Sequence, residues 1–229
     1  MKNILLLHGA IGDQNQFWEL AKILADDYKV HSLNFSGHGD HDSDENFSIT
    51  LFANDVLDYL NTNNLQKIDV FGYSMGGYVA IYLARFYPGK IGRIFTLATK
   101  FLWTPEIASS EIKMLDPDKI EQKLPAFAAI LAQRHGIRNW KNVLNKTAVF
   151  MTGLGDDNPL LPADYRQITN EIKLALGDAD TMVTLSETQT VADYLPNAAV
   201  IVLPGTAHAL EKTDINLLAV QIRAFLTMK

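Results

Sequence analysis

In the first part of the chain, short and continuously apolar runs alternate with longer stretches that carry apolar side chains on one helical face. Residues 1–8 are almost purely aliphatic, which is typical of a central parallel strand buried on both faces. Across residues 15–26 the apolar positions recur at helical spacing, as at Phe17, Leu20 and Leu24. The same two patterns predict strands at 29–33, 68–71 and 91–98, a helix at 50–61, and an apolar helix between the glycine-rich turn after residue 71 and Pro88. This alternation predicts an α/β fold with a doubly wound, mostly parallel sheet.

The pattern changes between residues 101 and 168. Strand signals largely disappear, prolines recur and amphipathic helical stretches dominate. Aromatic side chains such as Trp103 and Trp140 need burial, so this stretch is predicted to be a folded helical insertion and not a linker. The alternation resumes with strands at 172–177 and 199–203 and helices at 186–195 and 214–228. We therefore expect a core formed by residues 1–100 and 169–229, and a mainly helical lid at 101–168 inserted after the strand that ends near Ala98.

The composition narrows the class of protein. A chain of 229 residues with 48% hydrophobic residues suits one sizeable globular domain with an insertion. Its net charge of −6, without a basic block, argues against a nucleic-acid partner. No apolar run approaches the roughly 18 residues of a membrane span, so no membrane association is expected. The absence of cysteine excludes disulfides, thiolate nucleophiles and cysteine-ligated zinc, and we expect a cytoplasmic protein.

The segment with the clearest chemical signal is Gly72-Tyr73-Ser74-Met75-Gly76, which fits the G-x-S-x-G pattern of a nucleophile elbow. It lies between a predicted strand and a predicted helix, which is the context that the pattern requires. Ser74 must adopt a strained conformation to stand clear of the sheet, and the two glycines let strand and helix pass closely. The alternative is a glycine-rich turn with a solvated serine. The strand–turn–helix context favours a nucleophile.

Four further segments accompany this motif in a fixed order, and together the five resemble the α/β-hydrolase superfamily over nearly the whole chain outside the insertion. The resemblance implies the chain order serine, aspartate, histidine for the catalytic residues. Because the chain begins at the strand carrying His8, where the family usually has two earlier strands, we expect an N-terminally shortened sheet of about six strands. The four segments are Leu7-His8-Gly9-Ala10, Gly37-His38-Gly39, Gly177-Asp178-Ala179-Asp180 and Gly205-Thr206-Ala207-His208.

The resemblance implies that His208 is the catalytic base. A serine hydroxyl such as that of Ser74 is a poor nucleophile unless an adjacent base takes its proton. His8 and His38 are competing candidates, but both lie in family motifs where the imidazole usually has a structural part. The other histidines have no motif around them and are expected to be solvated: His31, His41 and His135.

The acid is expected to be Asp180, which matches the family's G-x-x-D pattern after a strand. Its role would be to fix the tautomer of His208 and to stabilise the imidazolium. Asp178 lies on the same loop and is an alternative, as are Asp156 and Asp157 in a stretch of similar local sequence.

The oxyanion hole in this fold uses the backbone N–H after the nucleophile and one from the loop after an early strand, which here are those of Met75 and Ala10. The helical insertion is expected to cover the nucleophile as a lid. The side chains expected to line the substrate pocket are Ile11, Trp103, Phe127 and Met151.

These expectations describe a serine hydrolase of the α/β-hydrolase type that cleaves a small carboxylic ester or thioester through an acyl-enzyme. The expected partner is a small acyl substrate, and no metal or organic cofactor is implied because Ser74, His208 and Asp180 supply the chemistry. One alternative is a carbon–carbon bond hydrolase or lyase on the same triad, and another is a non-catalytic small-molecule sensor. Serine at the elbow argues against the dehalogenases of the superfamily, which have aspartate there. The sequence does not indicate the oligomeric state.

Overall fold

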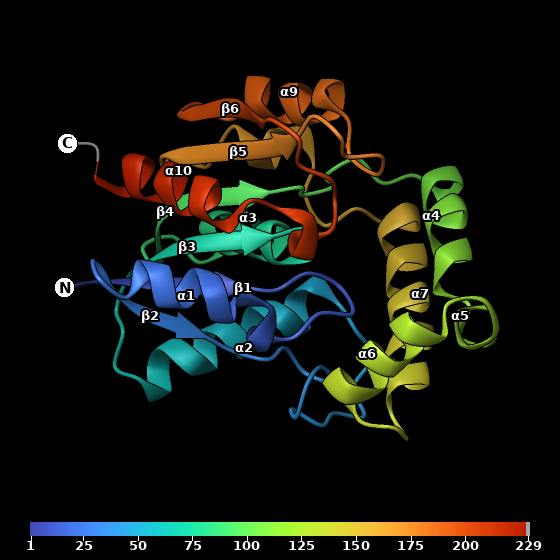
Figure 1. Cartoon of the computed structure of the whole chain (residues 1–229). Coiled ribbons are helices and arrows are strands. Elements are labelled where there is room, and N and C mark those ends of the chain that lie inside the picture. The colour runs from blue at the N-terminus through green and yellow to red at the C-terminus, as the bar shows by residue number, and fades with distance from the viewer. Residues whose placement is uncertain (228–229) are drawn as a thin grey trace.

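The centre of the computed structural model, which describes residues 1–227, is a six-stranded sheet with strand order β2-β1-β3-β4-β5-β6 (Figure 1). All five neighbouring pairs are parallel. The predicted α/β fold with a parallel sheet of about six strands is therefore confirmed. The strands are β1 (Lys2–Leu7), β2 (Tyr28–Ser32), β3 (Ile68–Tyr73), β4 (Ile91–Leu97), β5 (Ile172–Gly177) and β6 (Ala198–Leu203).

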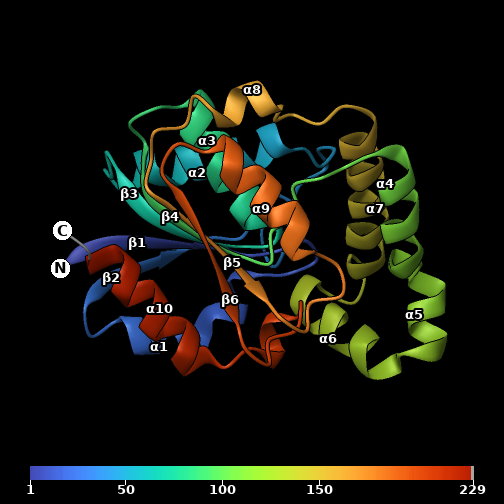
Figure 2. The ribbon, with the colours of Figure 1, turned by 90° about the horizontal axis from the view of Figure 1, so that it is seen from above.

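Helices cover both faces of the sheet. Alternate side chains along each strand point to opposite faces and pack into the two apolar layers between sheet and helices. Figure 2 shows the two groups of helices on opposite sides of the strands. In β1, Leu5 and Leu7 belong to one buried cluster, whereas Ile4 and Leu6 belong to the other, as a period of two requires. The continuous apolar run of this strand is explained by its burial on both faces. One face is covered by α1 (Trp18–Leu24) and α10 (Ile215–Thr227), and the other by α2 (Ile49–Thr62), α3 (Met75–Phe86) and α9 (Leu185–Tyr194).

Local signals set where several helices begin. The Ser48 hydroxyl accepts a hydrogen bond from the N–H of Leu51 at 3.0 Å, and Thr184 caps α9 in the same way. Four helices between β4 and β5 begin with proline, which has no N–H to lose in the first turn and a fixed φ suited to it. This explains why prolines recur in that stretch. The helices there are α4 (Pro105–Glu111), α5 (Pro117–Lys123), α6 (Pro125–His135), α7 (Trp140–Asp156) and α8 (Pro162–Tyr165).

We call residues 101–168, with these five helices, the helical segment. Its helices α4 to α7 lie beyond the carboxyl ends of the strands (Figure 1). Phe150 and Leu154 of α7 belong to the buried cluster on one face of the sheet, so the segment is joined to the core by apolar packing. It also has a small cluster of its own, formed by Leu115, Ile120, Ala128, Leu131, Trp140 and Leu144.

The predicted boundaries of the other core elements agree with the structure within two residues. The helix predicted at 15–26 is different, because it divides into a 3-10 turn (η1, Gln14–Phe17) and the shorter α1. The predicted end of the closing helix, Met228, lies outside the described residues. Two further 3-10 turns are η2 (Ile112–Leu115) and η3 (Leu210–Lys212). Of the helices described, none is long and apolar enough to cross a membrane.

Candidate active site

Ser74 stands on a sharp turn between the end of β3 and the start of α3. Its φ is +50°, in the left-handed region that residues with a side chain rarely adopt. A Cβ atom on Gly72 would lie 2.5 Å from the backbone of Gly77, and one on Gly76 would lie 2.2 Å from the carbonyl oxygen of Leu7. Both motif glycines are therefore needed for the close approach of strand and helix, which leaves the Ser74 side chain at the sheet's carboxyl edge.

His208 and Asp180 reach Ser74 from the loops after β6 and β5. The distance from Ser74 Oγ to His208 Nε2 is 3.5 Å, and that from His208 Nδ1 to Asp180 Oδ2 is 2.9 Å. The carboxylate fixes the proton on Nδ1, which leaves Nε2 free to accept the serine proton. The backbone of His208 is held in turn, because the Tyr73 hydroxyl donates to its carbonyl at 2.9 Å.

The Asp180 carboxylate is fully buried and has its remaining oxygen occupied. Oδ1 accepts hydrogen bonds from the N–H groups of Met182 at 2.8 Å and Val183 at 2.9 Å. Burial by itself would raise the pKa of Asp180, but the hydrogen bonds from His208 and the two N–H groups outweigh it, so the pKa lies below its usual value. The carboxylate is therefore ionised and its orientation is fixed.

The alternative acids lie elsewhere. Asp178 Oδ1 accepts a hydrogen bond from the N–H of Thr206 at 3.3 Å, so this side chain braces the loop that carries His208 without touching the imidazole. Asp156 and Asp157 are exposed at the end of α7 in the helical segment. Among the described residues, the carboxylate in contact with His208 is that of Asp180.

His8 and His38 are fully buried behind the first loop and do not reach Ser74. The Nδ1 of His8 bonds the carbonyl of Gly9 at 2.8 Å, and its Nε2 accepts from the N–H of Phe35 at 3.1 Å. Burial lowers the pKa of His8 to about 3 and also lowers that of His38, so both are neutral. Their hydrogen bonds to backbone groups indicate a structural part in holding the loops together.

Two histidines that were expected to be solvated are buried, and this expectation was wrong. His135 is 3% exposed and bonds the backbone of Ile11 and Gly39, which are about a hundred residues away in the sequence. His31 is 7% exposed and bonds two polar side chains of neighbouring elements. Neither environment can be read from the local sequence, because the partners come from other elements. His41 is exposed, as expected.

The two backbone groups predicted for the oxyanion hole lie at the same cavity as Ser74. Met75 begins α3, and Ala10 lies in a turn closed by a hydrogen bond from the N–H of Gly12 to the carbonyl of Gly9 at 3.1 Å. The first N–H groups of a helix have no partner within the helix, and no acceptor for either N–H is found within residues 1–227. Both donors are therefore free to bind an oxygen next to Ser74.

Two small cavities meet at Ser74. The smaller has about 30 Å³, and the larger has about 270 Å³ and also contacts His208. The four side chains predicted to line a substrate pocket are all found here: Trp103 in the smaller cavity, Ile11 and Phe127 in the larger one, and Met151 in both.

Sequence reasoning missed several side chains that shape these cavities. Tyr78 lines the smaller one, and its hydroxyl donates to the side chain of Asn158. Its position, one helical turn after Ser74 on α3, was a signal that could have been used. Met114 and Met182 line the larger cavity from the helical segment and from the loop after Asp180. No local pattern marks these two residues.

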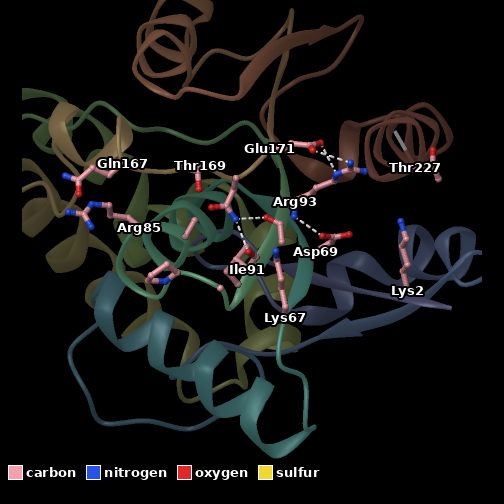
Figure 3. Close-up of a pocket in the computed structure, with 15 residues that line it drawn as sticks. Lys2, Lys67, Asp69, Arg85, Ile91, Arg93, Gln167, Thr169, Glu171 and Thr227 are labelled. Atoms are coloured by element: carbon pink, nitrogen blue, oxygen red, sulfur yellow. Dashed lines mark hydrogen bonds and ion pairs between the residues drawn. The ribbon is translucent and has the colours of Figure 1, made fainter. Parts of the chain in front are cut away.

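A separate cavity of about 840 Å³ lies at the amino ends of the strands, whereas Ser74 lies at their carboxyl ends. Figure 3 shows the side chains that line this cavity. It is lined by charged side chains, among them Lys2, Lys67 and Arg93, and the last of these is paired with Glu171 at 2.9 Å. It contains neither a serine nor a histidine. The pairing of Ser74 with His208 therefore favours the other edge as the candidate active site.

The arrangement at Ser74 suits acyl transfer, because it combines an activatable hydroxyl, a base with a fixed tautomer and two free N–H donors. Within the part of the chain that the structure describes, no cluster of three or more histidine, aspartate or glutamate side chains is placed to hold a metal ion.

Comparison with known proteins agrees with the fold. A family model described as alpha/beta hydrolase fold matches residues 2–134. The pimeloyl-[acyl-carrier protein] methyl ester esterase of Chromobacterium violaceum is 26% identical over 227 residues, which cover 90% of this chain and 87% of that protein. The 2-(acetamidomethylene)succinate hydrolase of Mesorhizobium japonicum is 21% identical over 231 residues, which cover 92% and 83%.

The crystal structure of the enol-lactonase from Burkholderia xenovorans LB400 superimposes on this chain with a TM-score of 0.79. The match covers 99% of this chain and 92% of that one at 18% sequence identity. At this identity the likeness concerns the fold.

Proposed function

The chain belongs to the α/β-hydrolase family of enzymes, and within it we propose a serine hydrolase that cleaves a small carboxylic ester or thioester. The observation that carries this proposal is the continuous line from Ser74 Oγ to His208 at 3.5 Å and from His208 to Asp180 at 2.9 Å. Apo sites often have loose nucleophile–base contacts that shorten when substrate binds, so 3.5 Å is compatible with the role.

In the proposed mechanism, His208 Nε2 takes the proton of Ser74 as Oγ attacks the acyl carbon. The carbonyl oxygen becomes an oxyanion, which the N–H groups of Ala10 and Met75 stabilise. His208 then gives its proton to the departing alcohol or thiol as the bond to the acyl carbon breaks. Water, deprotonated by the same imidazole, attacks the acyl-enzyme, and His208 returns that proton to Ser74 Oγ as the bond to the acyl carbon breaks and the acid leaves. Asp180 stabilises the imidazolium in both halves.

The names of the three relatives reported above support a hydrolase. One is an esterase of a methyl ester, one a succinate-derivative hydrolase and one an enol-lactonase. Identities between 18% and 26% do not carry their substrates over to this chain, so the substrate is argued from the cavities.

We propose that the acyl group is short and the leaving group larger and mainly apolar. His208 must protonate the leaving group, so the leaving group lies on the side of Ser74 where His208 is. That side is the cavity of about 270 Å³, whereas the side with Trp103 and Tyr78 has about 30 Å³. The larger apolar side chains that line this cavity are those of Ile11, Met114, Leu115, Phe127, Met151 and Met182.

Two isomeric esters test both parts of the proposal. Hexyl acetate has a two-carbon acyl group and a six-carbon alcohol, and ethyl hexanoate reverses them at the same composition. Because one methylene in a fitted pocket changes kcat/KM roughly 10-fold or more, we expect hexyl acetate to be preferred by at least about tenfold. A preference for ethyl hexanoate would refute the assignment of the two sides.

The serine chemistry is tested separately by labelling with a fluorophosphonate probe. We expect labelling of the wild type and none of Ser74→Ala. Labelling without turnover of either ester would favour the carbon–carbon alternative or a sensor over an esterase. Failure to label a folded wild type would refute the serine hydrolase altogether.

A further inference from the structure

Two adjacent side chains at the end of α6 bind a single backbone carbonyl in the loop after β1. The Nη1 of Arg134 donates to the carbonyl oxygen of Ile11 at 3.1 Å, and the Nε2 of His135 lies 2.9 Å from the same oxygen. These contacts join the helical segment to the core across more than 120 residues of sequence. Ile11 follows Ala10, whose N–H is one of the two proposed oxyanion donors.

The partners of His135 define which nitrogen carries the proton. The N–H of Gly39 points at Nδ1 at 3.0 Å, and an N–H can only donate, so Nδ1 is the acceptor. The proton of the neutral ring is then on Nε2, where it is donated to the carbonyl of Ile11. Burial lowers the pKa of His135, which agrees with a neutral ring.

The backbone that these residues hold is strained. Ile11 has a φ of +54° in the turn closed by the bond from the N–H of Gly12 to the carbonyl of Gly9. A β-branched side chain disfavours this region, so a turn of this shape needs restraint from outside. The side chains of Arg134 and His135 provide this restraint, because both bind the carbonyl of Ile11.

Arg134 is itself fixed in place by acidic side chains. Its Nε lies 3.4 Å from Asp13 Oδ1, and its Nη2 donates to Glu211 Oε1 at 3.1 Å. Asp13 follows the turn and Glu211 follows His208, so the guanidinium joins the proposed oxyanion loop to the loop of the proposed base. The Arg134 side chain is 12% exposed, which leaves little freedom for it to leave the turn.

We propose that Arg134 and His135 are positioning residues, which hold the Ala10–Ile11 turn so that the Ala10 N–H faces the oxyanion at Ser74. This inference rests on the proposed function, because it assigns the helical segment a part in that same reaction. The segment then contributes to the rate of acylation as well as to the shape of the cavity. An ordinary docking contact of α6 would instead affect stability and leave the rate of the folded enzyme unchanged.

Two substitutions at one position separate these roles. In His135→Gln the side-chain amide reaches the place of Nε2, so it keeps the donor to Ile11 and loses the acceptor for Gly39. In His135→Asn the shorter amide reaches the place of Nδ1, so it keeps the acceptor for Gly39 and loses the donor to Ile11. Each variant loses one hydrogen bond, and neither can ionise, so they form a matched pair.

The first readout is kcat and KM for hexyl acetate. Loss of an oxyanion-hole donor costs about 10²–10³ in kcat, and misplacement of one costs less, so we expect His135→Asn to lower kcat about 10–100-fold with a similar KM. We expect His135→Gln to recover most of this loss. Equal kcat values for the two variants would overturn the proposal, and circular dichroism of both identifies a variant that has not folded.

The second readout does not depend on activity. The N–H of Gly12 closes the turn and is buried, so its hydrogen exchange, followed by NMR, reports whether the turn is held. We expect faster exchange at Gly12 in His135→Asn than in His135→Gln, with core amides unchanged. Identical hydrogen exchange at Gly12 in the two variants would show that His135 does not hold the turn, and this would overturn the proposal even in an active enzyme. If the wild type is inactive but the variants differ in Gly12 exchange as expected, the proposed function is refuted, whereas the restraint of the turn by His135 stands.

Discussion

The core sheet and the helical segment are both built on buried apolar side chains, but they provide different things at the candidate site. All three proposed catalytic side chains lie on loops at the carboxyl ends of β3, β5 and β6 in the core. The helical segment adds cavity walls, such as Trp103 and Phe127, and the two side chains that bind Ile11. The proposed reactive groups thus lie on loops anchored by the sheet. The helical segment contributes the walls of the cavities and the side chains that bind the turn at Ile11.

The two regions also differ in how completely their apolar side chains are buried. The strands at the centre of the sheet are almost completely buried, whereas the helical segment leaves several large apolar side chains in solvent. Five of these are Met114, Leu124, Ile130, Ile137 and Val149. A catalytic geometry needs residues held within a fraction of an ångström, and a densely packed sheet provides this better than short helices do. The comparison predicts that changes in the core abolish chemistry and that changes in the segment modulate it.

The largest effect is expected from Ser74→Ala. Removal of a serine nucleophile lowers kcat by about 10⁴-fold or more, because the remaining groups have no acceptor for the acyl group. The unfolding midpoint should stay within about 2 °C of the wild type, since a single hydroxyl at the surface of the cavity is lost. Steady-state kinetics and a thermal scan measure both. Residual turnover near the wild-type level would mean that the core does not supply the nucleophile.

The next largest effect is expected from Asp180→Asn. The amide would donate to His208 Nδ1 and shift the proton of the ring to Nε2, which then cannot accept from Ser74, so kcat should fall about 10³–10⁴-fold at neutral pH. Asp178→Asn is the matched control on the same loop, because Asp178 bonds the N–H of Thr206 and not the imidazole. A comparable loss in both variants would contradict the assignment of the acid.

A smaller effect, on stability, is expected from shortening one buried leucine in each region. Leu6→Ala in the sheet and Leu131→Ala in the segment both remove fully buried side chains, so each should lower the free energy of unfolding by about 2–5 kcal/mol. Since Phe150 and Leu154 join the segment to the core cluster, we expect a single cooperative transition in both variants. Urea unfolding followed by fluorescence and circular dichroism tests this. Two separate transitions would show that the segment unfolds independently of the sheet.

The smallest effect is expected in the acid dependence of stability. The pKa of Asp180 is lower in the folded protein than in the unfolded chain, so its ionised form stabilises the fold above about pH 4, and this contribution is lost as the pH falls through the folded value. Asp180→Asn should therefore be less stable than the wild type at pH 7, and the difference should narrow below about pH 4. Urea titrations at several pH values measure it. A difference that stays constant with pH would argue against the lowered pKa.

Most of the strands and helices of the core could be predicted from local sequence patterns. The parallel sheet, its strand bounds and the elbow at Ser74 follow from apolar runs interrupted by glycine, which act over a few residues. The roles of His208 and Asp180 follow from the resemblance of their segments to the α/β-hydrolase superfamily, and both segments come directly after a predicted strand. The first helix was the exception, since the polar stretch at Gln14 closes as a 3-10 turn and not as an α-helical one.

The sequence by itself determined the fold class and the order of the elements, because periodicity and turn residues are local properties of the chain. It also indicated the three side chains proposed for catalysis, through short motifs that resemble those of the α/β-hydrolase superfamily. The tertiary structure decided the burial of His135, the partners of Arg134 and the unequal sizes of the cavities on the two sides of Ser74. Each of these depends on side chains that are far apart in the sequence and meet only when the helical segment packs against the loops of the sheet. Their contacts are set by packing in three dimensions, which no single stretch of residues encodes.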